Sequence, residues 1–109
     1  MPKRPPEDDF HRWRFVTNHA HVLATIASDP TVRLRDVARI VGITERTAAH
    51  IVDDLREAGY LTKTREGRRN SYEVHPELPL RHPLHKHRTV GELITFLQPR
   101  ASKKPRSTR

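Results

Sequence analysis

The sequence places guanidinium groups at two points where they could bind a polyanion. The stretch "TREGRRNSYEV", residues 64–74, carries three arginines around Gly67, and the stretch "TERTAAH", residues 44–50, carries Arg46 and His50. A guanidinium presents five N–H donors in a planar fork, so it can bind phosphate oxygens or the O6 and N7 atoms of guanine with paired hydrogen bonds. Both stretches therefore predict contact with a polyanion, and the elements around them indicate which one.

The composition describes a small basic chain. Its 109 residues include 21 Lys and Arg against 13 Asp and Glu, which gives a formal net charge of +8 at pH 7. Such a balance is typical of proteins that bind polyanions, although charge alone fits DNA, RNA, a ribosome or an anionic membrane. This length allows one domain with a modest core.

Several functional classes are excluded or disfavoured by what the sequence lacks. It contains no cysteine, so disulfides, thiolate nucleophiles and cysteine zinc sites are excluded. No apolar run approaches the roughly 20 residues of a membrane span, and no nucleophile elbow, phosphate loop or enclosed acid–base pair is recognisable. We therefore expect a non-enzymatic protein without a cofactor or membrane contact, located in the cytoplasm at the nucleoid.

Metal binding is the main alternative chemistry that the histidines suggest. Three of the 8 histidines lie in "RHPLHKH", residues 81–87. No carboxylate or cysteine accompanies them locally, Pro83 constrains the segment, and the neighbouring arginine and lysine repel a cation. The sequence therefore predicts no metal site.

Three regions are expected along the chain. Residues 1–9 combine prolines with charged side chains and predict a disordered tail. Residues 99–109 carry arginines and lysines without any acid and predict a basic, flexible tail. The structured domain is expected over 10–98, although the spacing within residues 10–17 fits an extended segment and a helix equally well.

Helical periodicity and end signals predict three helices in the first half of this domain, at 18–28, at 35–41 and from Thr44 to Gly59. Asn18 and Thr44 are the expected N-caps. Gly42 and Gly59 are the expected left-handed ends of the second and third helices. The β-branched piece "TVRL", residues 31–34, predicts a short strand between the first two helices.

Two strands and a fourth helix follow. The strands are expected at 61–65 and 70–74, joined by a turn that contains Gly67. Thr89 and Glu92 form a predicted capping box for the last helix. Inside that helix four apolar residues recur at i, i+3, i+4 and i+7, so the helix must bury this stripe against something.

The segment "LRDVARIVGITERTAAHIVDDL" resembles the helix-turn-helix pattern, with small Ala38 where two helices cross and Gly42 in the turn. The following segment, "DLREAGYLTKTREGRRNSYEV", resembles the end of the recognition helix and the wing of small bacterial winged-helix regulators of the MarR and ArsR type. This resemblance covers about 18–98. It implies a mainly α fold with a small β-hairpin, a winged helix-turn-helix, and regulation of transcription by binding double-stranded DNA.

The resemblance also assigns expected roles to the two cationic stretches. In helix-turn-helix docking the N-terminal residues of the second helix reach base edges, so Arg46 is the expected reader of guanine. A hairpin that follows this helix lies beside the major groove, so Arg68 and Arg69 at its tip are expected in the adjacent minor groove. The expected DNA contacts are Arg33, Arg35, Thr44, Glu45, Arg46, Thr47, His50, Lys63, Arg65, Arg68, Arg69 and Asn70.

Regulators of this resemblance usually dimerise through terminal helices, and two-fold operators place half-sites about one helical turn apart. The expected dimerisation residues are Phe10, Trp13, Val90, Leu93, Ile94 and Leu97. Ordinary core packing is the alternative explanation for the stripe in the last helix. Two other functions stay open: a non-specific architectural protein that binds nucleic acid, and a winged-helix module that binds proteins.

Overall fold

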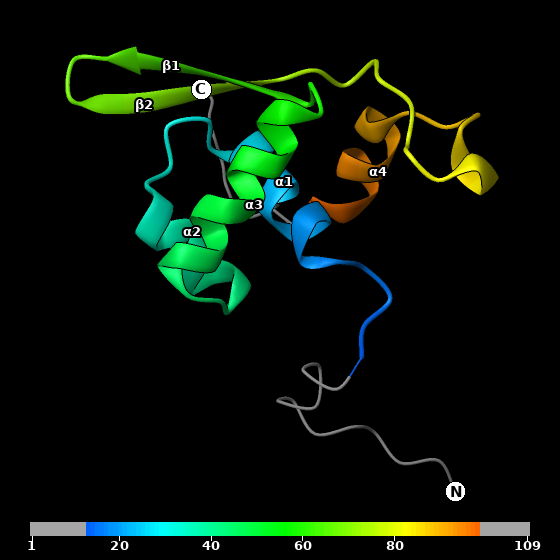
Figure 1. Cartoon of the computed structure of the whole chain (residues 1–109), viewed down its shortest axis with the longest axis horizontal. Helices are drawn as coiled ribbons and strands as arrows, with labels where there is room; N and C mark the ends of the chain where they lie inside the picture. Colours follow the sequence, from blue (N-terminus) through cyan, green and yellow to red (C-terminus); the bar gives the residue numbers. More distant parts are fainter. Residues whose placement is uncertain (1–12, 99–109) are drawn as a thin grey trace, which may run out of the picture.

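The computed structural model describes residues 13–98, so Phe10 and the tails expected at 1–9 and 99–109 lie outside the described part of the chain. Three helices come first, then a hairpin, a single 3₁₀ turn and a fourth helix (Figure 1). These elements are α1 (Asn18–Ser28), α2 (Leu34–Val41), α3 (Glu45–Glu57), β1 (Leu61–Glu66), β2 (Arg69–Val74), the 3₁₀ turn Pro83–His85, and α4 (Val90–Leu97). The order is that of a winged helix-turn-helix, as the sequence predicted.

The helix ends follow local signals. The Thr44 side chain accepts a hydrogen bond from the Thr47 N–H at 3.0 Å and caps α3. The capping box of α4 is also present, with the side chains of Thr89 and Glu92 each bonded to the backbone N–H of the other. The N-cap of α1 is Thr17 and not Asn18, because the Thr17 hydroxyl accepts from Ala20 N–H at 3.2 Å and Asn18 is already helical.

The turn between α2 and α3 sets the geometry of the helix-turn-helix. Gly42 ends α2 with a left-handed φ of 89°, and its N–H donates to the carbonyl of Ala38. A side chain at this φ would be strained, which explains the glycine. Ala38 is buried and belongs to the core shared by the helices, so a small residue there permits their close approach.

The expected strand at 31–34 was wrong. Within the described residues the sheet has two strands, β1 and β2. Val32 is buried, and the segment is joined to β2 through a backbone bond of 2.9 Å from Tyr72 N–H to the Pro30 carbonyl. Because α2 already begins at Leu34, too few residues remain for a ladder.

The core lies between α1 and the four elements that pack against it, α2, α3, α4 and β2. Val22 and Ile26 of α1 are fully buried, and α4 packs against α1 on the side away from the hairpin (Figure 1). Val90 and Ile94, two of the expected dimerisation residues, are only 4% and 8% exposed and join this core. Half of the α4 stripe is therefore intramolecular packing and is not available to a second copy.

The loop that leads from β2 to α4 is fixed to that helix. The N–H groups of Val90 and Gly91 donate to the carbonyls of Leu78 and Pro76 at 2.8 and 2.9 Å. A β-carbon on Gly91 would lie 2.7 Å from the β-carbon of Pro76, so glycine permits this close approach. The loop thereby fixes where α4 starts on the surface of α1.

Candidate nucleic-acid interface

The first half of α3 presents its polar side to solvent. Ala48 and Ile51 face the core, whereas Glu45, Arg46 and Thr47 are exposed. No hydrogen bond or ion pair within residues 13–98 engages the Arg46 side chain. Its guanidinium is therefore free to bind a group outside the protein.

The threonines of this turn are partly committed to the fold. The Thr44 hydroxyl accepts from the backbone of Thr47 and also donates to the Thr47 hydroxyl at 2.9 Å. Thr44 thus holds the first turn of α3 in place, and Thr47 is the threonine whose hydroxyl proton is still available to donate. Thr44 therefore supports the neighbouring Arg46 whether or not it touches DNA.

Two acids in the second half of α3, Asp53 and Asp54, are paired with basic side chains of the same chain. His19 of α1 donates to the Asp54 carboxylate at 2.8 Å, and the His50 ring lies 3.7 Å from the same oxygen. The hydrogen bond from His19 is the main reason that the pKa of Asp54 is lowered. Asp53 is paired in the same way with Arg56 at 3.4 Å. Because its ring faces Asp54, His50 is less free than Arg46 to meet DNA.

The hairpin places its basic residues on defined faces. Lys63 pairs with Tyr72 and Arg65 with Asn70 in the antiparallel register, and directly paired residues lie on the same face. Tyr72 is buried, which raises the pKa of its phenol. The face of the hairpin that is buried at Tyr72 therefore continues towards the tip as the exposed side chains of Lys63 and Arg65.

The tip of the hairpin differs from the expected one. The turn consists of Gly67 and Arg68, whereas Arg69 is already in β2 and pairs with Glu66. The Arg69 guanidinium donates twice to the Thr31 carbonyl, at 3.0 and 3.3 Å. Arg69 thus ties the wing to the α1–α2 connection, and Arg68 is the arginine at the tip.

The other expected contacts lie at the surface. Arg33 is the N-cap residue of α2 and Arg35 lies in its first turn, and both are exposed. The Arg65 side chain donates to the Gly67 carbonyl at 3.1 Å, which stiffens the turn that carries Arg68. The cationic residues therefore occupy α3, the wing and the start of α2, on three consecutive parts of the winged helix.

The expected dimerisation residues are divided between surface and interior. Trp13 is exposed and its ring contacts that of Phe15 edge-on, at 4.9 Å between centroids. Leu93 and Leu97 are half-buried. Sequence reasoning missed Phe15 and Phe96, which are highly exposed; their aromatic character was the available signal.

The histidine-rich segment, residues 81–87, contributes to the local fold. The His82 ring accepts from the Leu84 N–H at 3.0 Å and caps the 3₁₀ turn. No group of three or more potential ligands within residues 13–98 is arranged to hold a metal ion. Over the same range, no helix has the length and apolar character needed to cross a membrane.

Comparison with known families defines the class. Residues 18–62 match the family of winged helix-turn-helix DNA-binding domains, a stretch that includes α1, α2, α3 and the start of β1. The described chain therefore has a winged-helix fold, and residues 18–62 form its helix-turn-helix DNA-binding domain. A search of curated proteins found no match.

Among solved structures, the chain is similar to the PcaV transcriptional regulator from Streptomyces coelicolor, described as in complex with its natural ligand. The two sequences are 27% identical, and the superposition has a TM-score of 0.50. It covers 74% of this chain and 56% of PcaV, so this chain spans just over half the length of that regulator. The expected resemblance to small winged-helix regulators is confirmed.

Proposed function

We propose that the protein is a homodimeric regulator of transcription that binds duplex DNA in a sequence-selective way and represses by occupying a promoter. The observation that carries this proposal is the position of Arg46. It stands in the first turn of α3, exposed and without an intramolecular partner in the described chain. Selective binding needs a guanidinium group of this kind, without an intramolecular partner, at the N-terminal end of a recognition helix.

The proposed contacts divide into selective and non-selective ones. With α3 in the major groove, Arg46 donates to guanine O6 and N7, and Glu45, Thr47 and His50 lie beside it. Arg68 enters the adjacent minor groove, where negative potential attracts a guanidinium. The remaining residues contact phosphates and contribute affinity that falls with salt. These residues are Arg33, Arg35, Thr44, Lys63, Arg65, Arg69 and Asn70.

The homodimer is supported by the two-fold symmetry of operators and by the apolar surface that this chain exposes. A single winged helix reads one half-site, and two copies double the specific contacts. Trp13, Phe15 and Phe96 are 65%, 92% and 82% exposed, and large exposed apolar side chains mark protein-binding surfaces. The half-buried side chains of Leu93 and Leu97 add to this apolar surface. Such a regulator is placed in the cytoplasm at the nucleoid.

Selection from a random pool of duplex DNA at near-physiological salt tests the proposal. We expect enrichment of an inverted repeat whose half-sites lie about one helical turn apart. An Arg46→Ala variant taken through the same selection should enrich a motif degenerate at one or two positions of each half-site. Retention of DNA without any enriched motif would contradict selectivity and support an architectural protein, which the net charge of +8 favours as the second candidate. No retention would contradict DNA binding by the isolated protein.

A further inference from the structure

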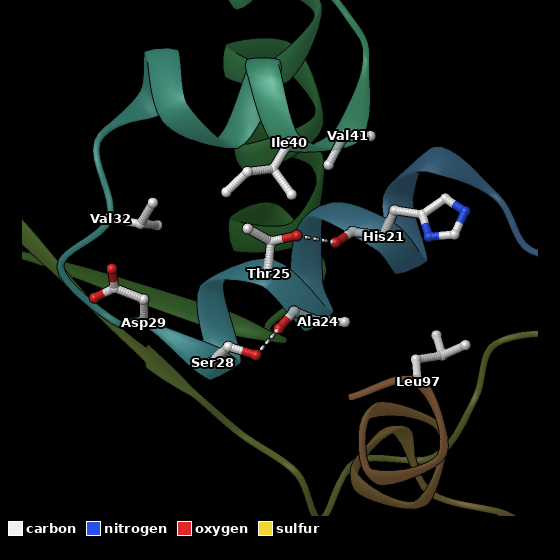
Figure 2. A pocket seen from close by; sticks show the side chains of 9 residues that line it. All are labelled: His21, Ala24, Thr25, Ser28, Asp29, Val32, Ile40, Val41 and Leu97. Atoms are coloured by element: carbon white, nitrogen blue, oxygen red, sulfur yellow. Dashed lines mark hydrogen bonds between the residues drawn. The ribbon is translucent and has the colours of Figure 1, made fainter. Parts of the chain in front are cut away.

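A groove runs along the outer side of α1, between α2 and the end of α4 (Figure 2). His21, Thr25 and Ser28 form its floor, since residues at i, i+4 and i+7 share one face of a helix. Ile40 and Val41 of α2 form one wall, and Leu97 of α4 forms the other. The hollow has a volume of about 370 Å³, which is large enough for bulky side chains. We name it the α1–α2–α4 groove.

The hydroxyl groups of this groove are already hydrogen-bonded within the chain. The Thr25 hydroxyl donates to the His21 carbonyl at 2.8 Å, and the Ser28 hydroxyl bonds to the Ala24 carbonyl and to the Gln98 side chain. Burial, with a smaller effect of the nearby Arg14 charge, lowers the pKa of His21, which favours the neutral form of its ring. The His21 ring and the Asp29 carboxylate are the polar groups that remain in the lining, whereas Val32, Ile40 and Leu97 give the groove walls that fit apolar side chains.

The same chain exposes aromatic side chains that its own core does not bury. Trp13 and Phe15 stand on the segment before α1 with their rings in contact. Leaving such rings in water is unfavourable, because burying an aromatic side chain removes about 150–250 Å² from solvent. Ile40, on the wall of the groove, is also 56% exposed. The molecule thus carries both an apolar groove and an exposed aromatic pair.

Residues 1–12 and 99–109 carry few large apolar side chains that could fill the groove. The apolar residues among 99–109 are Pro99, Ala101 and Pro105, and those among 1–12 are Met1, Phe10 and three prolines. A second copy brings Trp13 and Phe15 together. Two inserted rings bury about 300–500 Å² per copy, a large part of the roughly 800 Å² per partner of a stable interface. Since each copy both inserts and receives, the groove lining adds to this area.

Helix geometry permits such an exchange. The 11 residues of α1 span about 16 Å at 1.5 Å per residue, and Phe15 precedes the helix by three residues. In a two-fold dimer with antiparallel α1 helices, the segment before α1 of one copy lies over the end of α1 in the other. That end carries Thr25 and Ser28, the floor of the groove. A two-fold interface is self-complementary in this way.

We propose that the α1–α2–α4 groove is the docking site for the Trp13–Phe15 pair of a second copy of this chain. The inference rests on the homodimer of the proposed function and specifies its interface. It predicts that α4 takes part through Leu97 at the wall of the groove and not through the buried side of its stripe.

The absence of cysteine from the chain allows a direct test. A Phe15→Cys protein is mixed with a separately tagged Ile40→Cys protein under mild oxidation, and disulfide-linked heterodimers are followed on non-reducing gels. A disulfide needs α-carbons within about 4.4–6.8 Å, so it reports on close approach. The matched control is Phe15→Cys mixed with Leu84→Cys, because Leu84 is 69% exposed and lies outside the groove. We expect the first pair to cross-link at least tenfold faster than the control pair.

A second variant fills the groove from within. Thr25→Trp should convert the dimer to a monomer in light scattering, whereas Thr64→Trp on the wing should not, and circular dichroism should show both folded. A wild-type dimer that keeps its mass in Thr25→Trp and cross-links no faster through Ile40 than through Leu84 would overturn the docking site but not the homodimer. A wild-type monomer at all concentrations would overturn both. Binding to a single DNA half-site reports separately on the DNA-binding function.

Discussion

Two surfaces of this small protein expose opposite kinds of chemical groups to solvent. On the recognition surface, formed by the first half of α3 and the wing, Arg46 and Arg68 extend into solvent while apolar side chains turn inward. In the α1–α2–α4 groove the hydroxyls are bonded to their own chain, and apolar atoms face outward. The first arrangement suits a polyanion and the second suits apolar side chains. In the function proposed above, this difference separates DNA binding from self-association.

The two surfaces nevertheless share one core, and breaking that core should abolish both. Ile26 is fully buried on α1, and Ile26→Ala removes methyl groups and leaves a cavity, at a cost of about 2–5 kcal/mol. Urea denaturation should show this loss, with DNA binding and dimer mass declining together. Full retention of both functions in a markedly destabilised variant would show that the surfaces do not depend on this core.

A change confined to the recognition surface should separate the functions. Arg46→Ala is expected to lose about 1–3 kcal/mol of discrimination at one or two base pairs, because its paired hydrogen bonds to guanine disappear. Lys63→Ala is the matched control, and it should weaken binding to every duplex alike and lower the salt slope by about 1. Filter binding to a set of single-base operator variants measures both effects. Equal losses of affinity on all sequences for both variants would refute the division of roles. A change in the mass of the dimer in Arg46→Ala would also refute it.

A change near the groove should have the opposite pattern. Thr89→Ala removes the N-cap of α4 and should cost about 1 kcal/mol. Because α4 carries Leu97 at the wall of the groove, the dimer should dissociate at a higher protein concentration while a single half-site is still bound. Sedimentation equilibrium measures the first effect and fluorescence anisotropy the second. A Thr89→Ala variant that binds a half-site more weakly but has an unchanged dimer dissociation constant would contradict this prediction.

Within the wing, two neighbouring arginines should behave differently. Arg69→Ala removes two hydrogen bonds to the Thr31 carbonyl and should reduce stability by about 1 kcal/mol. Arg68→Ala should leave stability unchanged and lower the salt slope of DNA binding by about 0.9. Thermal melts and salt titrations of the two variants test this pair. The same melting temperature for both would show that the Arg69 contact contributes nothing in solution.

The smallest effect is a pH dependence at the α4 capping box. The hydrogen bond from the Thr89 backbone N–H is the main reason that the pKa of Glu92 is lowered from 4.5. A lowered pKa means that the carboxylate stabilises the fold above pH 4.5 and loses this effect as the pH falls through the folded value. The stability difference between wild type and Glu92→Gln should therefore be constant near neutrality and shrink below pH 4.5. A difference that grows on acidification would contradict this assignment.

Local features of the fold were predictable because they depend on a few adjacent residues. Thr44 and Thr89 are caps whose partners lie three residues away, and Gly42 adopts a conformation that other residues avoid. The N-cap of α1 was misplaced by one residue because Thr17 and Asn18 are both good caps.

Features that join distant parts of the chain were not predictable in the same way. The bond from Arg69 to Thr31 spans 38 residues and depends on how the wing lies against the α1–α2 connection. The burial of Val90 and Ile94 required knowing that α4 packs on α1. The groove was missed for the same reason, since its lining comes from three helices.

The central claim is selective binding of duplex DNA, and a salt series on two duplexes tests it most directly. Affinity of the wild-type protein is measured for the selected inverted repeat and for a scrambled duplex of the same composition. We predict that both affinities fall steeply with salt while the repeat stays at least about 10³-fold tighter. Equal affinities for the two duplexes at every salt concentration would contradict the claim.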